Sequence, residues 1–329
     1  MTGMPYASRG PVRRALLGAA ALALAAPALA QGSWRPRRPV RIIVPFSPGG
    51  ATDILARQIA QKVGNGLGQP FIVENRPGGN GVVGTQVLLT SPPDGHNLIM
   101  ASADTHTVLP FANPRVPYDV STFVPVNGAA YTVFGLVARS GLPAADVGEV
   151  VALAKRASPP LTYASYGIAS TSHVAGEMFK MLAGVDMTHV PYQGSGPATM
   201  AVAAGEVDVG LVPIAIAHPQ RDRLRLLGVA TGERFAMVPD LPTLAEQGVR
   251  LVADAWIGLL AAPGTPREIA ETINAAVSEV LGTPEMRASL QATGFSVMSL
   301  GPDRFAAFLA EESGRWGSAV RAAHISIAG

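Results

Sequence analysis

The first residues able to do chemistry lie where an apolar run meets a glycine turn. The run 40–46 has the composition of a strand, and Pro48-Gly49-Gly50-Ala51-Thr52-Asp53 follows it, with a helical pattern beginning near Ile54. The first turn of a helix carries amide N–H groups without intrahelical partners, and the helix dipole places partial positive charge there. The stretch therefore predicts a binding site for a carboxylate or a phosphate.

Two further turns of this kind lie in the middle of the chain. Residues 165–173 (SYGIASTSH) run into a helical pattern, and Gly194-Ser195-Gly196-Pro197 does the same, with proline near the helix position that favours it. Ligands of open α/β sheets bind at the carboxyl ends of strands, so the three turns can face one another across a cleft. The alternative is that each turn only caps its helix.

Strand-like and helical patterns alternate along the chain. We expect strands at 40–46, 70–75 and 97–102 and helices at 54–63 and 82–90, an order typical of a parallel sheet covered by helices. A second unit of this type follows, with strands expected at 133–137, 161–164, 188–192, 207–212 and 225–230 and helices at 147–157, 173–182 and 197–204. The chain is expected to end with a strand at 256–261 and helices at 268–281, 286–293 and 304–323.

Residues 1–30 have the pattern of a secretory signal peptide. Arg9, Arg13 and Arg14 precede an alanine- and leucine-rich run that ends in Ala28-Leu29-Ala30, an A-x-A cleavage pattern. The apolar run is shorter than the roughly 20 residues that a membrane span needs. We therefore expect cleavage near Ala30 and a periplasmic protein.

Charge and cysteine content exclude several classes of function. Without the three arginines of residues 1–30, 22 of the 25 basic residues remain against 23 acidic ones, so the footprint of a nucleic-acid-binding protein is missing. The chain has no cysteine, which excludes disulfides, thiol catalysis and thiolate metal sites.

The order of several motifs resembles the substrate-binding receptors of the tripartite tricarboxylate transporter family, also called Bug-type receptors. The resemblance covers essentially the whole mature chain, and its motifs include Pro48-Gly49-Gly50-Ala51-Thr52-Asp53, Val73-Glu74-Asn75-Arg76-Pro77-Gly78, Ser172-His173-Val174-Ala175-Gly176-Glu177 and His189-Val190-Pro191-Tyr192-Gln193-Gly194.

This resemblance implies an α/β, two-lobed periplasmic binding protein of type II, a Venus flytrap in which each lobe is a mostly parallel sheet flanked by helices. Lobe 1 would comprise 34–133 and 255–329 and lobe 2 would comprise 134–254, with a hinge near 133–137 and 254–259. Such receptors capture a small carboxylate in the periplasm and present it to a membrane permease. They are not enzymes and use no cofactor or metal, and we expect a monomer.

The resemblance also implies which residues hold the ligand. From lobe 1 these are Phe46, Ser47, Gly50, Ala51, Thr52 and Asp53. From lobe 2 they are Gly167, Ala169, Ser170, Thr171, His173, Gly194 and Ser195.

Two departures from the family pattern bear on specificity. The chain has Gly167-Ile168-Ala169-Ser170 and Leu211-Val212 where relatives often carry more polar residues. Both changes are expected to make the cleft more apolar, and the second removes a partner for a ligand ammonium group. We predict a carboxylate with an apolar or aromatic body.

Two of the predicted site residues have alternative roles. Asp53 either caps its helix or orients a water or the loop amides. His173 either donates to the ligand or makes a structural hydrogen bond, and with Glu177 it forms only half of a metal site.

A different class of function also has a motif. Gly79-Asn80-Gly81-Val82-Val83-Gly84 matches G-x-G-x-x-G between a strand and a helix, and Asp104 lies 20 residues after Gly84, where a ribose-binding acid belongs. This pattern would suit an NAD-dependent oxidoreductase. The intervening Asn75-Arg76-Pro77-Gly78 loosens the required turn, and the alternative is a turn with close helix packing.

Overall fold

The computed structural model describes residues 1–3 and 34–327. By its packing the chain divides between Trp34 and Arg35, and the fold described below is that of the second unit. Apart from its first three residues, the expected signal peptide lies outside the described residues. Within the described ranges, no helix combines the length and the apolar composition that a membrane crossing requires.

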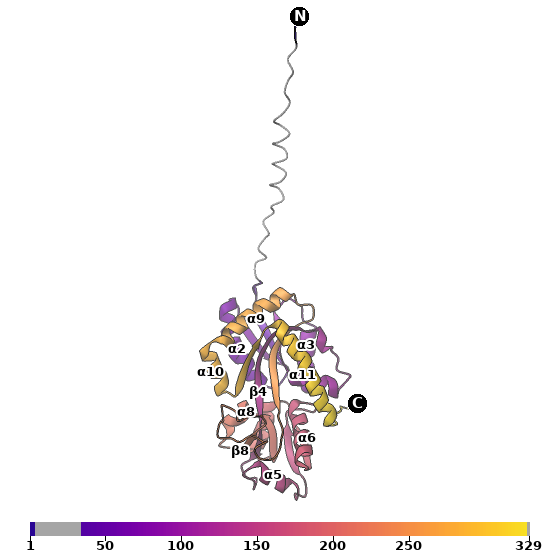
Figure 1. The fold of residues 1–329 in the computed structure, drawn as a ribbon, viewed down its shortest axis with the longest axis vertical. Coiled ribbons are helices and arrows are strands. Elements are labelled where there is room, and N and C mark those ends of the chain that lie inside the picture. Colours follow the sequence, from indigo (N-terminus) through magenta and orange to yellow (C-terminus); the bar gives the residue numbers. More distant parts are fainter. Residues whose placement is uncertain (4–33, 328–329) are drawn as a thin grey trace. The chain divides into compact units, whose positions relative to one another are not determined.

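Lobe 1 contains a mixed sheet flanked by helices (Figure 1). β1 pairs in parallel with β2 and β3, whereas β9 pairs antiparallel with both β3 and β4, and β10 lies antiparallel to β4. These strands are β1 (Val40–Val44), β2 (Phe71–Asn75), β3 (Asn97–Ser102), β4 (Val124–Arg139), β9 (Asp254–Ala261) and β10 (Phe295–Leu300).

Lobe 2 contains a second mixed sheet. Its strands are the end of β4 together with β5 (Leu161–Ser165), β6 (Met187–Pro191), β7 (Val209–Pro213) and β8 (Leu224–Val229). β5 pairs in parallel with β6 and β7, and β4 pairs antiparallel with β7 and β8.

β4 belongs to both sheets. Its pairing with β9 extends to Val133, opposite Asp254, and its pairing with β7 begins at Phe134, opposite Pro213. One continuous strand therefore links the lobes. The residue limits of the lobes and of the hinge stay predictions.

The expectation of mostly parallel sheets is wrong in detail, although the two-lobed α/β fold is confirmed. β4 runs from lobe 1 into lobe 2 and β9 returns, so these neighbours are antiparallel. The start of β4 was not expected, because Pro125, Asn127 and Gly128 interrupt its apolar pattern and its register shifts there. β10 was also not expected, because most of its residues are partly exposed.

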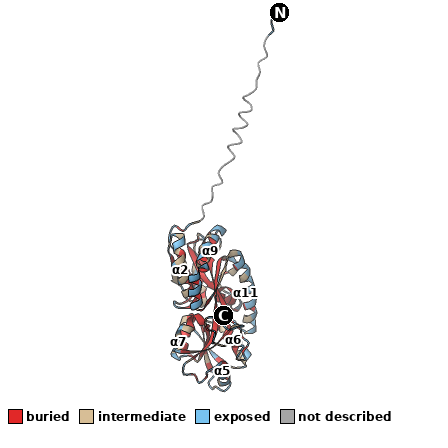
Figure 2. Ribbon diagram, turned by 60° about the vertical axis from the view of Figure 1, so that its left-hand side comes forward, coloured by how far each residue is buried: buried red, intermediate tan, exposed pale blue. Residues whose placement is uncertain are grey.

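Helices cover both sheets, with buried residues on the strands and inward helix faces and exposed residues outside (Figure 2). Around lobe 1 these are α2 (Ala51–Leu67), α3 (Val82–Leu89), α4 (Leu109–Ala112), α9 (Arg267–Gly282), α10 (Pro284–Ala292) and α11 (Pro302–Ala322). Around lobe 2 they are α5 (Val147–Ala154), α6 (Thr171–Ala183), α7 (Ser195–Ala204) and α8 (Ile214–Ala217).

A cluster of aromatic side chains forms the core between β9 and α11. Trp256 is completely buried, and its ring meets Phe305 edge to face with the ring centroids 5.6 Å apart. The indole Nε1 donates to Thr107 Oγ1 at 3.3 Å. Because aromatic burial contributes strongly to stability, this cluster anchors β9 within lobe 1.

His106 lies in the same core and makes folding sensitive to acid. Its ring packs against Phe123 with centroids 5.1 Å apart, and burial lowers its pKa to about 3. In the unfolded chain the pKa is about 6.5. The neutral ring therefore stabilises the fold fully above about pH 6.5, and this contribution is lost as the pH falls towards 3, by up to about 1.4 kcal/mol per pH unit.

We expect His106→Phe to reduce this acid sensitivity. The phenyl ring suits the aromatic surroundings and cannot take up a proton, although it forfeits the hydrogen bond between His106 Nδ1 and Thr105 Oγ1 at 2.7 Å. Melting temperatures measured from pH 7.5 to 4.5 should fall less steeply for the variant than for the wild type. If the melting temperatures of the two proteins fell equally with pH, the acid sensitivity could not be assigned to His106.

Candidate ligand-binding site

The turns at the starts of α2 and α7 touch each other between the lobes. The Ala51 amide donates to Ser195 Oγ at 3.1 Å, and a Cβ added to Gly196 would lie 3.1 Å from the Gly49 carbonyl oxygen. Nearby, Asn80 Nδ2 donates to the Ala169 carbonyl at 3.0 Å. These contacts describe lobes that are closed on each other.

An inner chamber lies beside these contacts, with walls from both lobes. Its volume of about 20 Å³ leaves room for about one water molecule. The Thr132 hydroxyl is buried and has no hydrogen-bond partner among the described residues. The lining residues are Phe46, Gly50, Ala51, Thr52, Ser102, Asp104, Thr132, Tyr166, Ser195, Pro213, Ala255 and Ile257.

A larger outer cleft, of about 430 Å³, shares two lining residues, Phe46 and Tyr166, with the inner chamber. Ile168 contributes an exposed apolar side chain to its wall. The lining residues are Pro45, Phe46, Pro77, Gly78, Gly79, Asn80, Gly81, Val82, Leu109, Asn113, Tyr166, Gly167, Ile168, Pro191, Tyr192, Gln193 and Ile327.

Asp104 of lobe 1 occupies the amino-terminal end of α6 in lobe 2. Its Oδ1 accepts from the Thr171 amide at 2.6 Å and from Thr171 Oγ1 at 2.9 Å, and its Oδ2 accepts from Ser102 Oγ at 3.0 Å. Burial raises the pKa of this carboxyl group, against the opposing effect of the hydrogen bonds. The amide of His173, in the same first turn of α6, donates to Ser170 Oγ at 3.1 Å.

Asp53 holds the Gly49-Gly50 turn in place. Its carboxylate accepts from the Gly49 amide at 2.9 Å, from Arg57 Nε at 3.0 Å and from Asn75 Nδ2 at 2.9 Å. Burial raises the pKa of the carboxyl group, but hydrogen bonds from Arg57, Gly49 and Asn75 outweigh burial and hold the pKa below its usual value. Asp53 lines neither cavity, and its contacts are those of a residue that orients loop amides.

We expect Asp53→Asn to destabilise the protein by about 1–3 kcal/mol, because the new amide would present donors to Arg57 and Asn75, which are donors themselves. Urea denaturation measures this loss. Arg57→Gln is the matched control, since the Arg57 side chain is 53% exposed and its ion pair should contribute less than about 1 kcal/mol. Equal losses in both variants would contradict a special role for the carboxylate.

His173 has structural partners in this conformation. Its Nδ1 accepts from the Ala169 amide at 3.1 Å, and its ring stacks on His189 with centroids 3.9 Å apart. Burial lowers the pKa of both rings, that of His189 to about 4. His173 lines neither cavity, and its contact with a ligand stays a prediction.

The predicted site residues divide into two groups. Those that line a cavity are Phe46, Gly50, Ala51, Thr52, Gly167 and Ser195. Those that line neither cavity are Ser47, Asp53, Ala169, Ser170, Thr171, His173 and Gly194. Sequence reasoning missed Ser102, Thr132 and Tyr166 in the inner chamber and linked Asp104 only to a nucleotide. Polar residues directly after the buried strand β3 were the available signal for Ser102 and Asp104.

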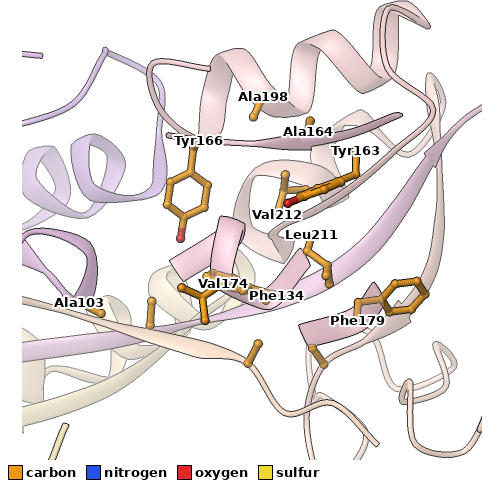
Figure 3. Close-up of a cluster of buried hydrophobic side chains, with 14 of the residues drawn as sticks. Ala103, Phe134, Tyr163, Ala164, Tyr166, Val174, Phe179, Ala198, Leu211 and Val212 are labelled. Carbon is orange, nitrogen blue, oxygen red and sulfur yellow. The ribbon is translucent and has the colours of Figure 1, made fainter. Parts of the chain in front are cut away.

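The expectation that Leu211 and Val212 make the cleft more apolar is wrong. Their side chains belong to the hydrophobic core of lobe 2 (Figure 3), are 2% and 0% exposed, and line neither cavity. Pro213, at the end of β7, is the residue that reaches the inner chamber. The apolar wall of the outer cleft instead includes Ile168.

The glycines of the G-x-G-x-x-G pattern serve packing. Gly81 has φ +90°, and a Cβ there would lie 2.3 Å from Thr105 Cγ2. A Cβ on Gly84 would lie 2.8 Å from Pro45 Cα, so the glycine lets α3 approach the turn after β1. Asp104, the ribose-binding acid of this alternative function, instead accepts a hydrogen bond from the Thr171 amide.

Comparison with known proteins places these features in a family. The model of the Tripartite tricarboxylate transporter family receptor matches residues 55–325. Protein BugT of Bordetella pertussis is 32% identical over 291 residues, which cover 87% of this chain and 89% of that protein. These relatives give no support for an oxidoreductase.

Solved structures agree with this assignment. R. palustris Rpa4515 with adipate has a TM-score of 0.85 and 30% identity, covering 88% of this chain and 99% of that one. MatC (Rpa3494) from Rhodopseudomonas palustris with bound malate has a TM-score of 0.80 and 33% identity, covering 87% and 99%. The chain described here therefore belongs to the tripartite tricarboxylate transporter family of receptors.

Proposed function

We propose that this protein is a periplasmic solute receptor that captures a small organic carboxylate for a tripartite tricarboxylate-type permease. The family assignment supports the role, and the adipate and malate in two similar structures support the ligand class. The inner chamber is the observation that carries the proposal, because both lobes line it and it contains hydrogen-bond donors.

The carboxylate head is proposed to bind at the start of α2. The first intrahelical hydrogen bond runs from the Ile54 amide to the Gly50 carbonyl, so the amides of Thr52 and Asp53 have no intrahelical acceptor. The unpaired Thr132 hydroxyl lies in the wall of the same chamber. Together these donors and the helix dipole favour an anion.

The body of the ligand is proposed to extend past Phe46 and Tyr166 into the outer cleft. This cleft is large enough for a small organic group, and Leu109, Ile168 and Val82 give it apolar walls. An apolar or aromatic body suits these walls.

Capture works by closure rather than by chemistry. The inner chamber, at about 20 Å³, is smaller than a carboxylate group, so the lobes must separate for entry and then close over the ligand less tightly than they do in this structure. A ligand that contacts both lobes stabilises the closed form and shifts the population towards it. We propose lobe 1 as 34–133 and 255–329, lobe 2 as 134–254, and a hinge near 133–137 and 254–259, where β4 changes partner.

The proposal is tested with protein purified from the periplasm. Thermal-shift and calorimetric titrations against mono-, di- and tricarboxylates, amino acids and NAD should give a response to carboxylates alone. At a hundred times its dissociation constant a ligand adds about 2.7 kcal/mol of stability. Sequencing of the amino terminus tests cleavage near Ala30, and light scattering tests the expected monomer. Binding of NAD or of amino acids only would overturn the proposal.

A further inference from the structure

We propose that Asp104, which lines the inner chamber, restricts this receptor to monocarboxylates by occupying the anion-binding end of α6 with the chain's own carboxylate. The inference rests on the proposed function and names the class of ligand within it.

The contacts of Asp104 are those that a bound carboxylate would make. Oδ1 receives two hydrogen bonds from Thr171, one from its amide at 2.6 Å and one from its hydroxyl at 2.9 Å, at the first residue of a 13-residue helix. Ser102 Oγ donates to Oδ2 at 3.0 Å, and the residue is 4% exposed. Whatever its protonation state, the side chain takes the donors that a second ligand carboxylate would need.

The remaining donors in the chamber suit one carboxylate. The unpaired hydroxyl of Thr132, 2% exposed, lines the chamber together with Thr52, whose backbone amide has no intrahelical acceptor. Among the described residues, none of those lining the inner chamber is a lysine, arginine or histidine. A second carboxylate placed beside Asp104 would therefore be desolvated without a counter-charge, which is unfavourable.

The outer cleft does not offer a second anion-binding site either. Its described lining residues include no charged side chain. A ligand that extends from the chamber into this cleft therefore gains most when its far end is uncharged, because burial of apolar surface is favourable and burial of an unpaired charge is not.

The experiment compares ligands matched in length and differing by one carboxylate. Calorimetry measures the affinity of each protein for four ligands: hexanoate and adipate form one pair, and benzoate and terephthalate form the other. Each pair gives one ratio of the monocarboxylate affinity to the dicarboxylate affinity. We expect the wild type to bind each monocarboxylate at least about tenfold more tightly than its dicarboxylate partner. Asp104→Ser, which frees the Thr171 donors, should reduce each ratio at least about tenfold, and Asp104→Asn should reduce it less.

Asp119→Asn is the matched control, because this carboxylate is exposed, caps a surface turn and lines neither cavity. Its ratios should equal those of the wild type. Circular dichroism checks that each variant folds. If Asp104→Ser does not fold, the test is whether the affinity ratios of Asp104→Asn are lower than those of the wild type.

Two outcomes separate this inference from the function on which it rests. A wild type that binds dicarboxylates as tightly as monocarboxylates, or Asp104 variants with unchanged ratios, would overturn the inference and leave the receptor function standing. If the wild type bound none of the mono-, di- and tricarboxylates tested for the proposed function, that function itself would be overturned.

Discussion

Gly196→Leu is expected to weaken carboxylate binding about 100-fold or more while leaving the protein folded. Gly196 is the second residue of α7, and a Cβ there would lie 3.1 Å from the carbonyl oxygen and 3.2 Å from the carbonyl carbon of Gly49. Both atoms belong to the backbone of the opposite lobe and cannot rotate away. A leucine side chain therefore keeps the lobes apart, and the contacts made only in the closed form are lost.

Calorimetry measures the loss, and small-angle scattering of the liganded protein should show a larger radius of gyration for the variant. Gly314→Leu is the matched control, because Gly314 lies within α11 and a Cβ there meets nothing within 4 Å. It should bind like the wild type and be slightly more stable, since leucine favours helices more than glycine does. Wild-type affinity in Gly196→Leu would show that closure is not needed for binding.

Trp256→Ala is expected to lower the free energy of unfolding by about 3–5 kcal/mol, the usual loss when a buried aromatic residue is truncated. The indole is fully buried, packs on Phe305 and Phe308, and donates to Thr107. Its removal leaves a cavity against β9, the strand that returns from lobe 2 to lobe 1. A protein of marginal stability would largely unfold.

Urea denaturation followed by circular dichroism gives this value without relying on tryptophan fluorescence. Phe111→Ala is a suitable comparison, because Phe111 is 39% exposed and should contribute much less. A loss below about 1 kcal/mol in Trp256→Ala would mean that the neighbouring side chains fill the space left by the indole, and that the cluster contributes little to stability.

Sequence patterns predicted local structure better than they predicted contacts between distant segments. The turn at Gly49-Gly50 and the serine turn before α6 were both anticipated, because caps and apolar periodicity are local. The antiparallel return of β9 beside β4 was not, because buried strands of either direction have the same apolar composition.

The same limit applies to the candidate site. Asp53 was identified from its place in the first turn of α2, and its bonds to Gly49 and Asn75 agree with one of the two roles considered. Asp104 was considered only within the alternative function, because its hydrogen bond to Thr171 joins residues 67 positions apart and no local pattern encodes such a pairing.

Phe46 and Tyr166 are shared by two cavities of different size, and this division has an evolutionary consequence. In the proposed binding mode different residues recognise the acidic group and the rest of the ligand, so substitutions at outer-cleft positions such as Ile168 can change the ligand body that is accepted and leave binding of the acidic group unchanged. Duplicated copies of such a receptor can therefore change their ligand specificity while they keep the same mode of binding the acidic group.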